Sequence, residues 1–160
     1  MEYKLIALDI DGTLLNSSNQ ITGNVKEAIK KSKEKGVKVV LCTGRPLKGV
    51  EDFLEELNLK EEGDYVTTFN GALVQDAYTG KPISHLTLDY NDLCDLYNLS
   101  LKIGSRSHFY DTKTVYTFNL DVSDYTILES YLTGAHLNVT TLDKDPKDIT
   151  PDYTLDTLGV

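Results

Sequence analysis

The sequence predicts an α/β fold, with a parallel sheet in the first half of the chain and an α+β module after it. Residues 3–71 alternate between short apolar stretches and stretches with helical spacing, in the order β-α-β-α-β. Short apolar strands with intervening helices are typical of a parallel sheet that has right-handed crossovers and helices on both faces. After Gly71 the alternation stops, and a hairpin, a helix and further short strands are expected instead.

Three strands and two helices make up the predicted parallel part. The strands are expected over residues 3–8, 37–44 and 64–71, which are apolar and rich in β-branched side chains. The first helix is expected over residues 22–36, with Thr22 as its N-cap and Gly36 as its C-terminal stop. The second helix is expected over residues 46–58, where Pro46 suits the first turn and an apolar stripe faces the core.

The second half of the chain is predicted to form a smaller α+β module. A hairpin over residues 72–88 turns at a Thr-Gly pair. Either Asp89 or Asn91 then caps a helix that Gly104 closes. The remaining expected elements are paired strands over residues 107–112 and 114–119, a helix over 122–134 and a strand over 135–142.

Composition restricts the class of protein. The chain has 160 residues, a formal net charge of −9 and 40% hydrophobic residues, which suits a globular protein. The negative charge argues against nucleic acid or a membrane surface as a partner, and the apolar runs are shorter than the ~20 residues that span a bilayer. Two isolated cysteines, Cys42 and Cys94, do not indicate a disulfide framework or a zinc site. We therefore expect a cytoplasmic protein.

Polar residues follow each of the three predicted parallel strands. They are Asp9 and Asp11 after the first strand, Thr43, Gly44 and Arg45 after the second, and Asn70 and Gly71 after the third. Any one of these residue types is common in loops. In a parallel α/β sheet, however, the carboxyl ends of the strands meet at one edge, where ligands bind. The sequence therefore predicts a binding site at that edge of the sheet.

The two aspartates indicate a bound cation. Two carboxylates a few ångströms apart repel each other unless a positive charge lies between them. Mg²⁺ prefers oxygen ligands and also attracts phosphate oxygens, so it would remove the repulsion and bind an anionic substrate. Side chains at i and i+2 of an extended segment point the same way, so Asp9 could attack a substrate while Asp11 transfers the proton.

The glycines and hydrogen-bonding side chains suit a phosphoryl group. Gly12 lets the backbone turn directly behind the two aspartates. Thr43 offers a hydroxyl, Gly44 offers an unobstructed N–H, and Arg45 offers a charge-assisted hydrogen bond.

These motifs resemble a known family. The segments DIDGTL at 9–14 and CTGRP at 42–46 are similar to the aspartate and threonine motifs of the haloacid dehalogenase superfamily. The segment FNGA at 69–72 and the hairpin behind it resemble the Cof-type, YidA-like sugar phosphatases. The resemblance extends from residue 3 to about residue 150. It implies a Rossmann-like core, of which residues 1–83 are the N-terminal part, with an inserted α+β cap that begins at residue 84 and includes residues 84–160.

The resemblance also implies a reaction. It implies Mg²⁺-dependent hydrolysis of a small phosphorylated metabolite, a sugar phosphate, through an aspartyl-phosphate. Asp9 would be the nucleophile and a metal ligand, and Asp11 would be the acid and base, with its backbone carbonyl also on the metal. Thr43, Gly44 and Gly12 are the expected phosphate-binding residues. Arg45 and Asn70 are the expected substrate-binding residues, and the cap would select the substrate.

The chain departs from the family pattern in its second half. Members of the family supply a later lysine and a Gly-Asp metal motif, and neither is found here. The chain therefore looks like the N-terminal part of such an enzyme, ending inside its cap, and we expect it to be inactive alone. An exposed sheet edge would then favour a homo-oligomer. Two alternatives remain open: a non-catalytic binding or interaction protein, and a phosphotransferase such as a mutase.

Overall fold

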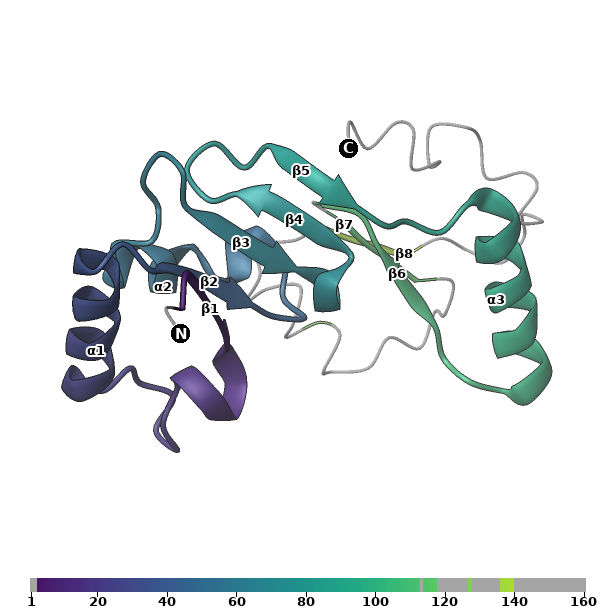
Figure 1. Ribbon diagram of the computed structural model, residues 1–160. Coiled ribbons are helices and arrows are strands. Elements are labelled where there is room, and N and C mark those ends of the chain that lie inside the picture. The colour runs from purple at the N-terminus through teal and green to yellow at the C-terminus, as the bar shows by residue number, and fades with distance from the viewer. Residues whose placement is uncertain (1–2, 113, 118–126, 128–135, 140–160) are drawn as a thin grey trace. The chain divides into compact units, whose positions relative to one another are not determined.

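The chain divides into two compact units, which are described separately. The computed structural model describes residues 3–112, 114–117, 127 and 136–139 (Figure 1). The first unit is Met1–Leu86 and the second is Thr87–Val160.

A five-stranded sheet forms the centre of the first unit. Its strands are β1 (Leu5–Asp9), β2 (Lys38–Cys42), β3 (Tyr65–Thr68), β4 (Leu73–Asp76) and β5 (Pro82–His85), in that spatial order. The first three strands are parallel, and β3, β4 and β5 pair antiparallel as a meander (Figure 1). The predicted parallel part and the predicted hairpin are both confirmed. β1 lies at one edge of the sheet.

Two helices connect the parallel strands. The first, α1 (Gly23–Glu34), follows Thr22 as expected and is followed by Gly36 at a φ of 77°. The second is shorter than predicted, because a 3₁₀ turn, η2 (Leu47–Gly49), precedes α2 (Glu51–Glu56). Val50 separates the 3₁₀ turn from α2, because its φ of −131° is not helical. This break directs the Val50 side chain into the core, where it is fully buried, so packing outweighs the continuous helical spacing of the sequence.

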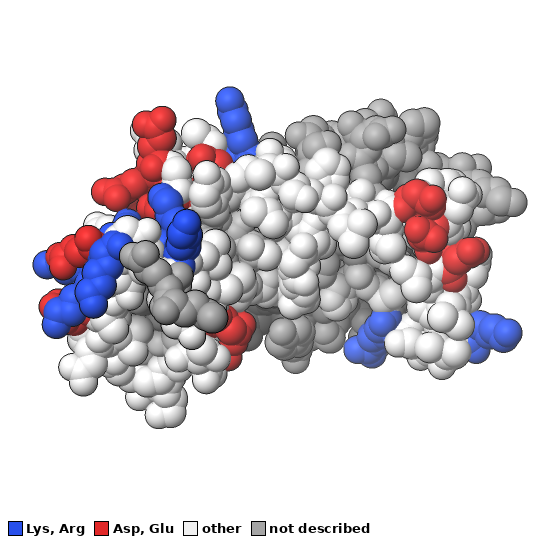
Figure 2. All heavy atoms as spheres, in the orientation of Figure 1, with Lys and Arg blue, Asp and Glu red and all other residues white. Residues whose placement is uncertain are grey.

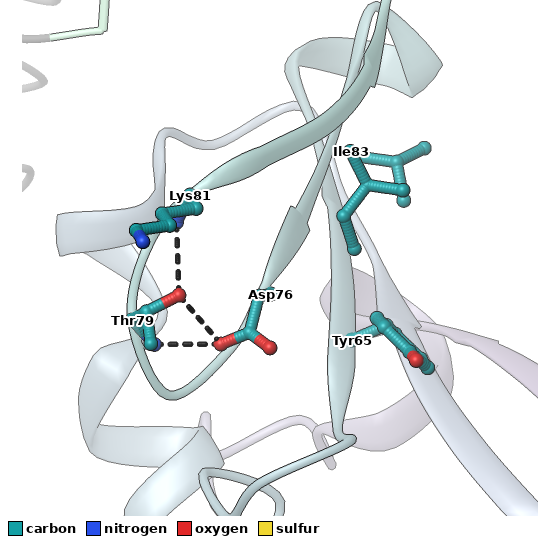
Figure 3. Close-up of a pocket in the computed structure, with 6 residues that line it drawn as sticks. Tyr65, Asp76, Thr79, Lys81 and Ile83 are labelled. Atoms are coloured by element: carbon teal, nitrogen blue, oxygen red, sulfur yellow. Dashed lines mark hydrogen bonds between the residues drawn. The ribbon is translucent and has the colours of Figure 1, made fainter.

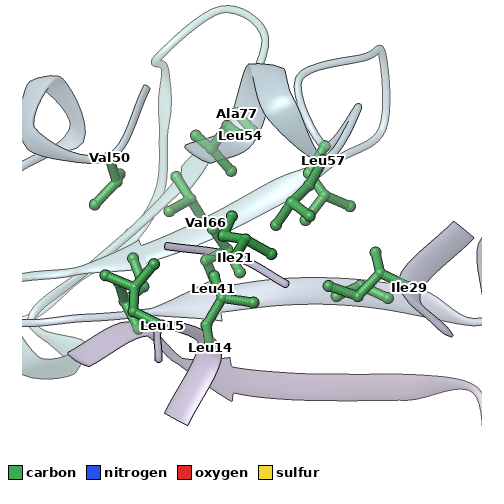
Figure 4. Packing of buried hydrophobic residues seen from close by; sticks show 13 residues of the cluster. Leu14, Leu15, Ile21, Ile29, Leu41, Val50, Leu54, Leu57, Val66 and Ala77 are labelled. Carbon is green, nitrogen blue, oxygen red and sulfur yellow. The ribbon is translucent and has the colours of Figure 1, made fainter. Parts of the chain in front are cut away.

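Both helices lie on one face of the sheet. Ile29 of α1 and Leu54 of α2 belong to a single buried cluster with Leu41 of β2 and Val66 of β3 (Figure 4). The expectation of helices on both faces is therefore wrong for the first unit. The reason is topological: the strands advance in one direction from β1 to β3, so two right-handed crossovers place their helices on the same side.

The other face of the sheet is partly open. Alternation along β1 and β3 directs Leu5 and Tyr65 to this face, and they are 55% and 38% exposed.

On the surface of the first unit, acidic and basic side chains are intermingled (Figure 2). One ion pair, Lys26–Glu56, joins α1 to α2.

The second unit contains one described helix and a three-stranded sheet. The helix α3 (Tyr90–Ile103) is capped by Asp89, whose side chain accepts a hydrogen bond from the Asp92 N–H at 2.9 Å, and Gly104 ends it in the left-handed conformation. The strands are β6 (His108–Tyr110), β7 (Thr114–Thr117) and β8 (His136–Val139). β6 and β7 pair with each other, as predicted, and they are antiparallel, whereas β7 and β8 are parallel.

Part of the predicted second module lies outside the described residues. Of the helix expected over residues 122–134, only Ile127 is described, and it is helical. Residues 140–160 are not described. In the described part of the chain, no helix is long and apolar enough to cross a membrane.

Candidate active site

The candidate site lies where the parallel strands end. Asp9 is the last residue of β1, and it pairs in register with Cys42, the last residue of β2. The Thr43 N–H continues the ladder by donating to the Thr67 carbonyl of β3 at 3.0 Å. The carboxyl ends of β1, β2 and β3 therefore lie together at the same end of the sheet, as the sequence predicted.

A tight turn over η1 (Ile10–Leu14) follows Asp9. Ile10 and Leu14 are buried at 0% and 3% exposure, whereas Asp9 and Asp11 are exposed. Burial of Ile10 between the two acids thus directs both carboxylates away from the core. Gly12 has a φ of 78°, which an L side chain rarely adopts, so a glycine suits this point of the turn.

Arg45 binds Asp11 with two hydrogen bonds. Arg45 Nε lies 3.2 Å from Asp11 Oδ2, and the terminal Nη2 lies 2.7 Å from Oδ1. The other terminal nitrogen donates to the Gly49 carbonyl at 3.5 Å, and the guanidinium carbon lies 5.8 Å from the centre of the Phe53 ring. Among the described residues, none forms a hydrogen bond or an ion pair with the Asp9 carboxylate.

Thr43 is buried beneath these groups. Its side-chain oxygen accepts a hydrogen bond from the Arg45 N–H at 3.1 Å, and the residue is 5% exposed. Because the oxygen serves as the acceptor, the hydroxyl proton is left to donate to a ligand.

The turn after β3 packs directly on Gly44. A Cβ at position 44 would lie 2.9 Å from Asn70 Oδ1, so only a glycine allows the Asn70 side chain this approach. Asn70 N–H donates to the Thr43 carbonyl at 2.9 Å, and Phe69 N–H donates to the Arg45 carbonyl at 3.4 Å. Phe69, Asn70 and Gly71 all have positive φ, at 51°, 56° and 96°. A left-handed conformation is costly for a bulky residue, so these tertiary contacts hold the turn.

The structure thus joins most of the predicted site residues by direct contacts. The linked residues are Asp11, Thr43, Gly44, Arg45 and Asn70, with Gly12 in the same turn as Asp11. Arg45 was expected to contact substrate, but in this structure its side chain contacts Asp11. The sequence did not reveal Phe53 as a neighbour of Arg45, because its helical spacing indicated core packing, and it does also pack against the core.

The oxygen ligands at the carboxyl ends of these strands suit a hard metal ion only in part. Asp9 ends β1 and Asp11 lies in the turn behind it. Among the described residues there is no group of three or more His, Cys, Asp or Glu side chains that could hold a metal. Asp9 offers an exposed carboxylate, while both Asp11 oxygens are hydrogen-bonded to Arg45. Carboxylate and carbonyl oxygens are the ligands that Mg²⁺ prefers, and Mg²⁺ usually keeps several waters.

A hollow of about 630 Å³ lies elsewhere, on the β4–β5 hairpin. It is lined by Tyr65, Val74, Asp76, Thr79, Lys81 and Ile83 (Figure 3). Its acidic residue is already engaged, because Asp76 Oδ1 accepts hydrogen bonds from the Thr79 N–H and hydroxyl at 2.7 and 2.8 Å. These bonds from Thr79 lower the pKa of Asp76. The polar groups of this hollow therefore stabilise the hairpin turn.

The family model for haloacid dehalogenase-like hydrolases matches residues 6–157. The chain belongs to this family. It is 52% identical over 147 residues to "Putative phosphatase YxeH" of Bacillus subtilis, which covers 92% of this chain and 54% of that protein. It is 33% identical over 111 residues to "Phosphatase YwpJ" of the same organism, which covers 69% of this chain and 36% of that protein.

A solved structure of the same family agrees with the fold. A haloacid dehalogenase-like hydrolase from Bacteroides thetaiotaomicron matches with a TM-score of 0.71 and 28% identity, over 94% of this chain and 55% of that one. The chain thus spans about half the length of the YxeH phosphatase and of the Bacteroides hydrolase. This haloacid dehalogenase-like chain places Asp9 at the end of β1 and Asp11 in the turn behind it, and Asp9 is in register with Cys42, the residue before Thr43.

Proposed function

We propose that the chain carries the nucleophile of a phosphatase that hydrolyses small phosphomonoesters through an aspartyl-phosphate on Asp9. The observation that carries this proposal is the Asp9 carboxylate, which is exposed and held by no other described residue. A nucleophilic carboxylate needs an accessible oxygen that is not engaged elsewhere. Relatives that are named phosphatases support the removal of a phosphoryl group as the overall reaction.

The proposed reaction has two steps. First, an Asp9 oxygen attacks the phosphorus and the bond to the ester oxygen breaks, while Asp11 gives a proton to the leaving oxygen. Asp11 then takes a proton from a water molecule, whose oxygen attacks the phosphorus and releases inorganic phosphate and the Asp9 carboxylate. In both steps the Thr43 hydroxyl and the Gly44 N–H would donate to phosphoryl oxygens. Gly12 has no side chain that would block the approach of the phosphoryl group.

We propose Mg²⁺ as the cofactor of this reaction. The Asp9 carboxylate and the Asp11 main-chain carbonyl would hold it, together with water. When bound, Mg²⁺ would reduce the repulsion between the Asp9 carboxylate and an incoming phosphate. The support from this structure is the pair of oxygen donors at the end of β1.

We propose a sugar phosphate or another small phosphorylated metabolite as the substrate, with residues 84–160 forming part of a cap that selects it. Asn70 lies at the edge of the site with an exposed side chain and is a candidate for substrate contact. A phosphotransferase would use Asp9 and Asp11 in the same way. The two reactions differ in what accepts the phosphoryl group, which is water in a phosphatase and a second metabolite in a phosphotransferase.

The test is to trap the covalent intermediate. The chain is mixed with a polypeptide that carries the remainder of a full-length relative and is incubated with Mg²⁺ and a reactive aryl phosphate. The reaction is quenched in acid and digested, and any phosphoryl group added to this chain is located by mass spectrometry. We expect it on the peptide that contains Asp9 and expect Asp9→Asn to abolish it. Asp52→Asn, at an exposed acid of α2, is the matched control and should leave labelling unchanged.

Two results would contradict the covalent mechanism. Labelling that persists in Asp9→Asn would place the nucleophile elsewhere. Phosphate binding without any labelling, in the presence of that added polypeptide, would favour the alternative of a non-catalytic binding protein.

A further inference from the structure

We propose that Arg45 is a positioning residue that holds the Asp11 carboxylate away from a metal ion bound at Asp9. This inference rests on the proposed function, in which Asp9 and the Asp11 main chain bind Mg²⁺. It differs from the expectation that Arg45 binds the substrate phosphate.

The geometry of the pair supports this role. Both Asp11 oxygens are taken, at 3.2 Å by Arg45 Nε and at 2.7 Å by a terminal nitrogen. Exposed ion pairs generally contribute little, and these side chains are 37% and 58% exposed for Arg45 and Asp11. Two-point binding by a guanidinium is the exception, because the planar fork fixes both distance and direction.

Arg45 itself is fixed from several sides. Its main chain is held by Thr43 Oγ1, which accepts from its N–H, and by Phe69, whose N–H donates to its carbonyl. Its guanidinium also contacts the Gly49 carbonyl at 3.5 Å and the face of the Phe53 ring at 5.8 Å. The Arg45 guanidinium that binds Asp11 is therefore already oriented by contacts with the segment after β2 and with α2.

The chemistry explains why such a restraint is useful. Two carboxylates separated by one residue would both bind a hard cation. A guanidinium stays protonated and binds a carboxylate at two points, so Arg45 competes with the cation for the Asp11 carboxylate. With Asp11 held by Arg45, the cation is left with the Asp9 carboxylate.

The two roles for Arg45 predict opposite results. If Arg45 restrains Asp11, Arg45→Met frees a second carboxylate, and the affinity for Mg²⁺ alone should rise by roughly three- to fivefold, the scale of one partly exposed ionic contact. Affinity for inorganic phosphate in saturating Mg²⁺ should change by less than about twofold on the same scale. If Arg45 binds phosphate, phosphate affinity should fall and Mg²⁺ affinity should be unchanged. Calorimetry and the amide NMR signals of Asp11 and Gly12 measure both.

A double-mutant cycle separates restraint from simple charge. In an Asp11→Asn background there is no second carboxylate to release, so Arg45→Met should alter Mg²⁺ affinity by less than about twofold, and the difference between backgrounds is the coupling energy. Equal effects in both backgrounds would overturn the proposal. Arg45→Lys keeps the charge but loses the fork, so we expect an intermediate rise in Mg²⁺ affinity. Lys48→Met, at a nearby cation that pairs with Glu51 at 2.7 Å, is the control and should change nothing.

A metal-free measurement tests the pair by itself. The Arg45 Nε–H NMR signal should be protected from solvent exchange in the wild-type chain and should lose that protection in Asp11→Asn. Unchanged protection would overturn the restraint. Failure of the proposed function would give a different result. If Mg²⁺ did not bind near Asp9, both the proposed metal site and the positioning role of Arg45 would be overturned. Normal Mg²⁺ binding and labelling of Asp9, with no response to Arg45→Met, would overturn the inference alone.

Discussion

Gly44 and Asn70 approach so closely that a Cβ at position 44 would lie 2.9 Å from Asn70 Oδ1. We expect Gly44→Ala to displace the exposed Asn70 amide and to weaken phosphate binding, with a loss of stability of about 1 kcal/mol or less because only the end of a side chain must move. Phosphate titration and urea unfolding measure the two effects. Adding Asn70→Gly removes the clash and tolerates the positive φ, so it should restore the stability but not the binding. A stability loss that Asn70→Gly does not relieve would contradict this contact.

A buried carboxylate stabilises the opposite end of the sheet. Asp64 has a side chain that is 5% exposed and lies 3.4 Å from Lys33 Nζ and 3.9 Å from Lys38 Nζ, and it also accepts the Glu61 N–H at 3.1 Å. Asp64→Ala leaves these donors without their buried acceptor, so we expect a loss of about 2–3 kcal/mol in the free energy of unfolding by urea.

Glu61→Ala is the matched control for that measurement. Glu61 pairs with the same lysine, Lys33, but its side chain is 72% exposed. Its removal should change stability by no more than about 0.5 kcal/mol, as for other exposed pairs. Equal losses for the two variants would show that burial of Asp64 contributes nothing.

The chemistry at the end of β1 predicts different defects for the two aspartates. In a full-length enzyme, Asp9→Asn should abolish turnover, because an amide is not a nucleophile. Asp11→Asn should slow turnover by about 10²–10⁴-fold, the usual contribution of general acid–base catalysis. Single-turnover kinetics with an aryl phosphate measure both. A rate for Asp11→Asn within about twofold of wild type would make Asp11 structural rather than catalytic on that scale.

The sequence predicted what depends on local pattern. The parallel strands, the hairpin and the family follow from apolar runs, turn residues and the DIDGTL and CTGRP motifs, and the strands, the hairpin and the family are confirmed. Relatives that are named phosphatases support the class of enzyme that we propose for this chain. The choice between Asp89 and Asn91 as the cap of α3 required the structure, since both residue types are good N-caps.

What the sequence could not predict depends on contacts between distant segments. The left-handed Phe69 is held by hydrogen bonds from its turn to the loop after β2, against its local preference. The pairing of Arg45 with Asp11 joins two residues that are 34 positions apart in the sequence, and the guanidinium also contacts the Gly49 carbonyl and the Phe53 ring. The roles assigned to the site residues remain predictions that the experiments above address.

β1 forms an outer edge of the five-stranded sheet. β1 pairs with β2 alone within the described residues, so its outer row of backbone N–H and C=O groups has no strand beside it. Its Leu5 side chain is 55% exposed on the open face. Edge strands of this kind pair readily with another chain. We therefore expect the 160-residue chain to self-associate as concentration rises and to show near-background phosphatase activity when assayed alone.

Light scattering across a concentration series, with an aryl phosphate assay on the same samples, checks this expectation. Leu5→Lys places a charge on the edge strand, which natural sheets use to prevent pairing, so it should shift the chain toward monomer. Leu96→Lys is the matched control, because Leu96 is 43% exposed on α3 in the other unit, and it should leave the association unchanged. A monodisperse wild-type monomer would rule out association through β1. Mg²⁺-dependent turnover by that monomer would further mean that the described half of the site is sufficient for catalysis, with the charge of the phosphoryl group balanced by residues of this chain.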